Sequence, residues 1–128
     1  MTELQLGNKN VGDGHPAFII AEIGINHQGD VSIAKNLIQK AKECGTDAVK
    51  LQKRSISRIL TKSGLEMAYD NRNSFGKTYG EHKIALELSE ADYHELNTYC
   101  KKVRTSMCQE RNINCEIFKH DLCFFRTR

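Results

Sequence analysis

The sequence predicts an α/β fold built on parallel strands, and three observations support this prediction. A short, continuously apolar run at 17–23 is typical of a strand buried on both faces of a sheet. A helical apolar repeat follows at 31–44, and a second strand pattern comes soon after it, at 47–52. Such a strand–helix–strand unit pairs its two strands in parallel through a right-handed crossover.

The elements around this unit are predicted in order along the chain. Residues 4–14 alternate apolar and polar side chains and then supply Gly and Asn, which accept the φ angles of tight turns, so we expect an N-terminal hairpin. The 31–44 helix has Asp30 or Ser32 to cap its first amides, and Gly45 stands where helices commonly end. Its apolar face is formed by Ile33, Leu37, Ile38 and Ala41.

The second half of the chain gives weaker signals. Residues 53–88 show little periodicity, and a structureless segment of that length is usually functional or disordered. A helix is predicted at 90–102, because Ser89 can cap its start and Leu88 can pack on Tyr93. Residues 103–128 contain no Gly or Ala and follow neither period clearly, so we expect a body at 1–102, a divergent tail at 103–128 and no third strand.

Length and composition favour one soluble globular domain. The chain has 128 residues, of which 39% are hydrophobic and 27% are charged. The longest apolar run, 17–21, is far below the roughly 20 residues that cross a bilayer, and residues 1–10 lack the pattern of a secretory signal. We therefore expect a cytoplasmic protein without a membrane segment. The net charge of +3, spread along the chain, is only weak support for nucleic-acid binding, so no nucleic-acid partner is expected.

The cysteines predict neither disulfides nor a metal site. Their number, five, is odd, and no CxxC pair is present, so reduced thiols are expected. Four potential zinc ligands occur late in the chain, but their intervals match no common structural zinc site. These are Cys108, Cys115, His120 and Cys123.

Polar residues at the predicted strand ends are the first candidates for chemistry. In parallel α/β folds the carboxyl ends of the strands converge on the ligand site, which places Glu22, Lys50 and Gln52 there. A buried carboxylate beside a lysine can act in acid–base chemistry or hold anionic and hydroxylated groups of a substrate. The alternative is an ion pair that only neutralises two buried charges.

Two loops supply further candidates. The 24–30 turn has two glycines that allow backbone amides to approach an anion, and its His27 is either a ligand or proton carrier or a histidine bonded for structure. The aromatic and basic residues of the later loop can stack on bases, but no RNA-binding signature surrounds them. They are Phe75, Lys77, Tyr79, His82 and Lys83.

Several of these segments together resemble a known family. The strings FIIAEIGINHQGD at 18–30, AKECG at 41–45, DAVKLQK at 47–53 and SFGKTYGEH at 74–82 closely resemble the N-acetylneuraminate (sialic acid) synthase family. The resemblance covers about residues 4–102 and implies an incomplete (β/α)8 TIM barrel, consisting of an N-terminal hairpin and the first two βα units. The full-length family condenses phosphoenolpyruvate with N-acetylmannosamine or a related N-acylated hexosamine, releases phosphate, and uses Mn²⁺ or Mg²⁺ to polarise the sugar aldehyde.

The resemblance also implies roles for individual residues. Glu22 is expected to be the catalytic carboxylate of the first strand, Lys50 a cation near phosphoenolpyruvate, and Gln52 a hydrogen-bonding group for the sugar. Asn26 and His27 are expected to shape the first loop. Tyr79 is expected in a loop over the barrel mouth, and the hairpin is expected to cap the barrel bottom.

The region after Lys102 departs from the family. The family's metal-binding histidines and most of its phosphoenolpyruvate contacts lie on later strands, so we expect this chain alone to bind no metal and to be inactive. A frameshift, a premature stop after mis-splicing or a gene-model error would each give such a tail. Open sheet edges would favour aggregation or self-association. Two alternatives are a small non-catalytic binding or interaction protein whose tail completes its core, and a split enzyme completed by a second chain.

Overall fold

The computed structural model describes residues 3–6 and 9–112, and the side chains of this range up to 108. None of the helices in these ranges is both long and apolar enough to cross a membrane. The elements are β1 (Leu4–Leu6), β2 (Lys9–Val11), β3 (Ile20–Gly24), α1 (Val31–Glu43), β4 (Ala48–Arg54), α2 (Ile56–Ile59), α3 (Lys62–Glu66), α4 (Tyr79–Ala85), α5 (Glu90–Val103) and β5 (Ser106–Asn112).

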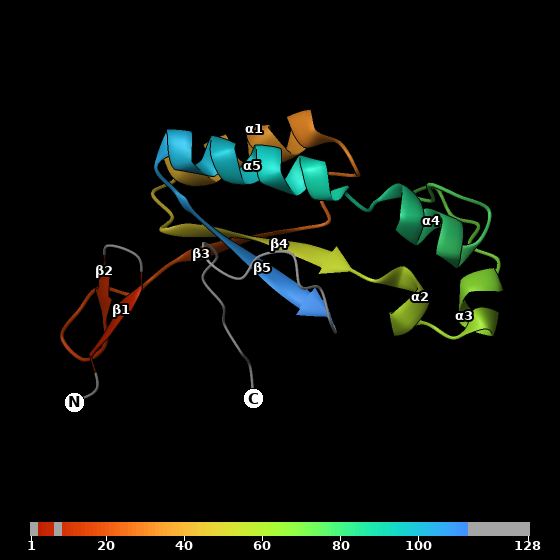
Figure 1. Ribbon diagram of the computed structural model, residues 1–128, viewed down its shortest axis with the longest axis horizontal. Coiled ribbons are helices and arrows are strands. Elements are labelled where there is room, and N and C mark those ends of the chain that lie inside the picture. Colours follow the sequence, from red (N-terminus) through yellow and green to blue (C-terminus); the bar gives the residue numbers. More distant parts are fainter. Residues whose placement is uncertain (1–2, 7–8, 113–128) are drawn as a thin grey trace.

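A parallel sheet in the order β3-β4-β5 forms the centre of the structure. Helices α1 and α5 cover one face of this sheet, and the short helices α2, α3 and α4 lie beyond the carboxyl end of β4 (Figure 1). Both crossovers therefore place their long helix on the same side, as right-handed βαβ units do. The predicted α/β class with parallel strands is confirmed.

The sheet contains a strand that the sequence analysis did not predict. Ser106–Asn112 forms β5 and pairs with β4 in parallel, so the expectation of no third strand after Lys102 is wrong. Helices commonly end at a glycine in the left-handed conformation, but here Arg104 adopts that conformation, with φ of 57°, at the end of α5. Residues 113–128 of the predicted tail lie outside the described residues.

Two further expectations need correction. The segment 53–88 is not structureless, since it contains three helices of four to seven residues, too short to show an apolar period. The apolar run at 17–23 is not buried on both faces, because Ile19 is 54% exposed and Glu22 is also exposed. The strand β3 lies at the edge of the described sheet, which explains this exposure.

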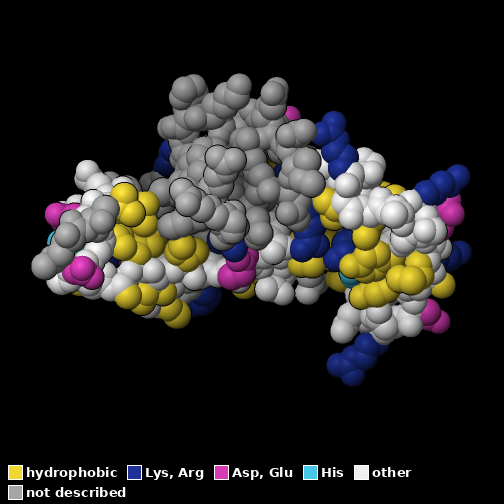
Figure 2. Space-filling model, turned by 90° about the horizontal axis from the view of Figure 1, so that it is seen from below, with side chains coloured by type: hydrophobic (Ala, Val, Ile, Leu, Met, Phe, Trp, Pro, Cys, Tyr) yellow, Lys and Arg dark blue, Asp and Glu magenta, His cyan; other side chains and the backbone are white. Residues whose placement is uncertain are grey.

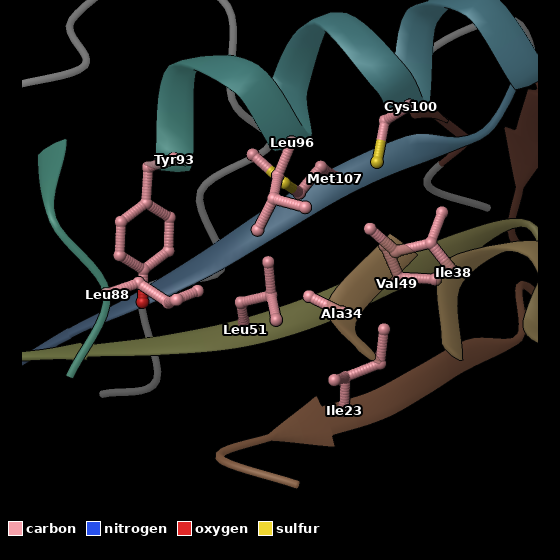
Figure 3. Close-up of a cluster of buried hydrophobic side chains, with 10 residues drawn as sticks. All are labelled: Ile23, Ala34, Ile38, Val49, Leu51, Leu88, Tyr93, Leu96, Cys100 and Met107. Carbon is pink, nitrogen blue, oxygen red and sulfur yellow. The ribbon is translucent and has the colours of Figure 1, made fainter. Parts of the chain in front are cut away.

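The hydrophobic core lies between the sheet and the two long helices. Figure 3 shows Tyr93, Leu96 and Cys100 of α5 pointing toward side chains of β4 and β5, with α1 completing the layer. The core residues are Ile23, Ala34, Ile38, Val49, Leu51, Leu88, Tyr93, Leu96, Cys100 and Met107. The predicted cap of α5 is confirmed, since Ser89 accepts a hydrogen bond from the amide of Asp92 and Asp92 bonds back to Ser89.

The predicted N-terminal hairpin is also confirmed, with β1 and β2 paired antiparallel. Lys9 of β2 forms an ion pair with Asp47, which directly precedes β4. The same carboxylate accepts a hydrogen bond of 2.8 Å from the amide of Ile19, and these bonds hold the pKa of Asp47 below its ordinary value. The hairpin is thereby attached to the amino end of the sheet, the end opposite the predicted site.

Candidate functional site

An ion pair joins the first two parallel strands, β3 and β4, at the third residue of each strand. Glu22 and Lys50 face each other in the β3–β4 register, and Glu22 Oε2 lies 2.5 Å from Lys50 Nζ. Val49 and Leu51 point toward the helices, so Lys50, the residue between them, points to the opposite face of the sheet. The structure thus brings together the two predicted charged residues. Lys50 does not stand at the end of its strand as predicted, because β4 continues to Arg54.

The surroundings of this pair differ from the prediction. The side chain of Glu22 is 47% exposed and that of Lys50 is 31% exposed, so the expectation of a buried carboxylate is wrong. The reason is that β3 lies at the edge of the described sheet, and the described helices α1 and α5 cover only the opposite face (Figure 1). Because solvent reaches both groups, a polar ligand can reach them too.

Gln52 extends the same row of polar side chains along β4. It stands two residues after Lys50 on the same face of the strand, and its Oε1 accepts a hydrogen bond from Arg54 Nη2. Its backbone carbonyl accepts a bond of 2.8 Å from the hydroxyl of Tyr93. Arg54 was missed by the sequence analysis, although the alternation of β4 places it in this row.

The first loop, residues 24–30, starts directly beside Glu22. Gly24 has φ of 58°, and a β-carbon added there would lie 3.6 Å from Glu22 Oε1. Asn26 closes the turn, since its backbone N–H and its side-chain Nδ2 each donate a hydrogen bond of 3.0 Å to the carbonyl of Ile23. The side chain of Asn26 shapes the loop in this way, as the resemblance implied, while its contact with a substrate stays a prediction.

His27 lies inside the first loop rather than at its surface. The residue is only 1% exposed, and Nδ1 of the ring accepts a hydrogen bond of 3.0 Å from the amide of Gly29. Nε2 is buried and has no hydrogen-bond partner among the described residues. Burial lowers the pKa of His27, and the charge of Glu87 and the backbone of Gly24 oppose this only in part. These contacts favour a structural role for His27, as a buried and hydrogen-bonded histidine, over a role as a ligand or proton carrier.

A second ion pair, missed by the sequence analysis, joins β4 to the segment before α5. Lys53 Nζ lies 2.7 Å from Glu87 Oε1 and donates to the carbonyl of Leu88 at 3.0 Å. The amide of Arg54 donates to the same carboxylate oxygen at 3.1 Å. The side chains of Lys53 and Glu87 are only 18% and 15% exposed. The only hint in the sequence is that Lys53 stands on the helix-facing side of β4.

Tyr79 belongs to an aromatic cluster on the α2–α4 segment. Its ring centroid lies 5.1 Å from that of Tyr69 and 6.3 Å from that of His82, and Lys83 Nζ lies 4.9 Å from the Tyr79 centroid. Nδ1 of His82 accepts a bond of 3.2 Å from the amide of Phe75. Burial lowers the pKa of His82. The role of Tyr79 in binding a substrate stays a prediction.

The described residues do not form a divalent-metal site. Within the described part of the chain, no group of three or more His, Cys, Asp and Glu side chains is placed to hold a metal ion. The Glu22 carboxylate is paired with the ammonium group of Lys50.

The comparisons with known proteins agree with this architecture. Residues 37–109 match the NeuB family, so the match extends past the predicted boundary at 102. The N-acetylneuraminate-9-phosphate synthases of Mus musculus and Homo sapiens are 50% and 52% identical over 93 residues, which are 73% of this chain and 26% of each relative. The chain thus spans about a quarter of the length of these relatives.

Two solved structures share the fold. The N-acetylneuraminic acid synthetase of Leptospira borgpetersenii superposes with a TM-score of 0.64 at 24% identity, over 84% of this chain and 33% of that one. The spore coat polysaccharide biosynthesis protein SpsE of Bacillus subtilis gives a TM-score of 0.57 at 30% identity, over 84% and 27%. The fold is therefore the parallel α/β sheet of one part of a NeuB-type TIM barrel. The chain belongs to the NeuB family, the sialic acid synthases, and represents its N-terminal region.

Proposed function

We propose that this chain is the N-terminal part of the barrel of a sialic acid synthase, and that it contributes Glu22, Lys50 and Gln52 to the active site. The observation that supports this proposal is the ion pair of Glu22 and Lys50 across adjacent parallel strands. Glu22 is two residues from the carboxyl end of β3, and Lys50 is followed on the same face of β4 by Gln52 and Arg54, toward the edge where α/β barrels bind their substrates. The pair also lies on the helix-free face of the sheet, which becomes the interior when a barrel closes.

The chemistry of the proposed reaction suits these groups. The methylene carbon of phosphoenolpyruvate bonds to the aldehyde carbon of the sugar, whose oxygen takes up a proton and becomes a hydroxyl. Water adds to the neighbouring carbon, which carries the phosphate, and loses a proton; the C–O bond to phosphate then breaks with release of inorganic phosphate. Lys50 has three N–H donors, so its ammonium group can hold Glu22 and a phosphoenolpyruvate oxygen together. Glu22 can accept a hydrogen bond from a sugar hydroxyl or take a proton from the attacking water.

The substrate proposed here is an N-acylated hexosamine. Joining three carbons of phosphoenolpyruvate to a six-carbon sugar gives a nine-carbon acid, and carbon 6 of the sugar becomes carbon 9 of the product. The names of the mouse and human relatives specify a 9-phosphate. N-acetylmannosamine 6-phosphate is therefore the first substrate to test, with unphosphorylated N-acetylmannosamine as the comparison.

The 128-residue chain by itself is proposed to be inactive. Its three described parallel strands are fewer than the eight that close a barrel, so substrates cannot be enclosed and water cannot be excluded. The family's Mn²⁺ or Mg²⁺ would be bound by residues elsewhere in the full barrel. The groups of this chain would then orient the two substrates and move protons.

The test compares the chain alone with the same residues 4–112 fused to the remaining barrel of the mouse relative. Release of inorganic phosphate from phosphoenolpyruvate is measured with each sugar, with and without added Mn²⁺. Turnover by the fused protein and none by the chain alone would support the proposal. A fused protein that folds and binds metal but releases no phosphate would contradict it, and would favour a non-catalytic binding protein instead.

A further inference from the structure

We infer that His27 is a positioning residue that fixes the first loop against the connection between α4 and α5. The ring lies at the centre of the loop, and Nδ1 accepts the amide of Gly29 while the His27 carbonyl accepts the amide of Asp30 at 2.9 Å. Since Asp30 in turn caps α1 through the amides of Ser32 and Ile33, the backbone and ring of His27 together link the loop after β3 to the start of α1.

The loop is pressed against a distant segment of the chain. A β-carbon added to Gly29 would lie only 2.4 Å from the carbonyl oxygen of Ala85 and 3.6 Å from the Cα of Leu86. Gly29 has φ of 77°, and its neighbour Gln28 has φ of 56°. This close approach requires glycine and a defined loop geometry, which the bond from Gly29 to the ring supplies.

The other side of the same connection is held by β4. Glu87 accepts bonds from Lys53 Nζ and from the amide of Arg54, and it is the charged group that acts on the ring of His27. The connection between α4 and α5 therefore lies between the ends of β3 and β4. On the β3 side it contacts the first loop, which His27 fixes through Gly29, and on the β4 side it is bonded to Lys53. Since Gly24 adjoins the Glu22 carboxylate, the position of the loop affects the position of Glu22.

This arrangement requires a neutral imidazole. An Nδ1 that accepts a hydrogen bond carries no proton, so the proton of the neutral ring is on Nε2. Protonation of Nδ1 would place two donors against each other and break the bond to Gly29. The groups that face the ring from the packed elements are Glu87, whose charge favours protonation, and Lys53, which neutralises Glu87. Burial of the ring opposes protonation more strongly.

The importance of this fixation for substrate binding rests on the proposed function, but the fixation itself can be measured without catalysis. The ¹⁵N-labelled 128-residue chain is titrated from about pH 8 to about pH 5, a range in which histidine changes charge. We expect the wild-type ring to be the Nε2–H tautomer. We also expect the amide resonances of Gly29 and residues 85–88 to shift with the same midpoint as the His27 ring.

Two variants and a control sharpen the test. His27→Asn keeps an acceptor near the position of Nδ1, so the Gly29 amide should stay protected while its response to pH disappears. His27→Phe keeps a ring without an acceptor, so exchange of the Gly29 amide should accelerate on the order of tenfold. His94→Gln, at a histidine whose side chain is 60% exposed on α5, should change neither property.

An Nδ1–H tautomer in the wild-type chain would overturn the inference. So would a Gly29 amide that does not respond when the His27 ring titrates. Both results come from the wild-type protein and hold even if His27→Phe does not fold. A catalytically inactive fused protein would leave these observations unchanged, so failure of the proposed function and failure of this inference are distinguishable.

Discussion

Two buried histidines make the stability of the chain depend on pH. Burial holds the folded-state pKa of His27 and of His82 below the ordinary value of 6.5, so the unfolded chain binds more protons between these values. Their contribution to stability is therefore fully present above about pH 6.5 and is lost as the pH falls through the folded-state pKa values. The free energy of unfolding in urea, measured across this range, should decrease toward acid. In His27→Asn, the free energy of unfolding should depend less steeply on pH, because only His82 still contributes. A slope equal to that of the wild-type chain would contradict the contribution of His27.

The cysteines should differ in reactivity because of their burial. Burial raises the pKa of the Cys100 thiol to about 12, whereas Cys44 is exposed at the end of α1. Since the thiolate is the reactive species, a short pulse of iodoacetamide near neutral pH should label Cys44 in the folded chain and spare Cys100. Peptide mass spectrometry, with the urea-unfolded chain as the control, measures both sites. Equal labelling of the two cysteines in the folded chain would show that α5 does not cover the sheet as described.

The contact between the first loop and the α4–α5 connection gives a prediction at the level of elements. Gly29 and Gly45 both have positive φ, but only at Gly29 would a β-carbon meet another atom, the carbonyl of Ala85. Gly45→Ala should therefore cost about 1 kcal/mol, from backbone strain alone. Gly29→Ala should cost roughly 1–3 kcal/mol more, because the loop and the connection must separate. Urea unfolding of both variants measures this difference, and equal costs would contradict the contact.

The elements that the sequence predicted correctly have signals that are local in the chain. The helix at 31–44 has a periodic apolar face, and the start of α5 has the cap of Ser89 with Asp92. The strand β5 was missed because its preceding turn uses Arg104 in place of glycine. The short helices α2–α4 were missed because a helix of one or two turns shows no apolar period.

The same distinction applies to the candidate site. Glu22 and Lys50 were predicted together because the carboxyl ends of parallel strands lie on the same side of a sheet. The structure pairs them in the β3–β4 register, although β4 runs four residues past Lys50. The burial of His27 and the pairing of Lys53 with Glu87 depend on where a segment 34 or more residues away packs. No local pattern of side chains encodes such a packing, so these features required the structure.

At the scale of the whole molecule, the described part of the chain has the surfaces of an unclosed barrel. Of the described strands, β3 and β5 each pair with a neighbour on one side only. Figure 2 shows hydrophobic side chains gathered at the surface of the end formed by α2–α4, where Met67, Phe75 and Ile84 are between 47% and 64% exposed. Unpaired strand edges and exposed apolar groups favour association.

We therefore expect the isolated chain to self-associate. Sedimentation velocity over a range of concentrations should show the mean mass rising with concentration. The fused protein, in which further strands pair with β3 and β5, serves as the matched comparison and should show no open-ended growth. A chain that stays monomeric at every concentration would show that its sheet edges are protected, and would favour a self-contained binding protein.

The most direct test of the central claim compares two glutamates in the fused protein. Glu22 pairs with Lys50 and Glu95 pairs with Lys35, both at 2.5 Å and with similar exposure, but Glu95 lies on the helix surface. Because both pairs are substantially exposed, Glu22→Gln and Glu95→Gln should each change the free energy of unfolding by less than about 1 kcal/mol. Phosphate release should fall by about 10²-fold or more in Glu22→Gln and stay unchanged in Glu95→Gln. Equal activity of the two variants would contradict a role for Glu22 at the barrel mouth.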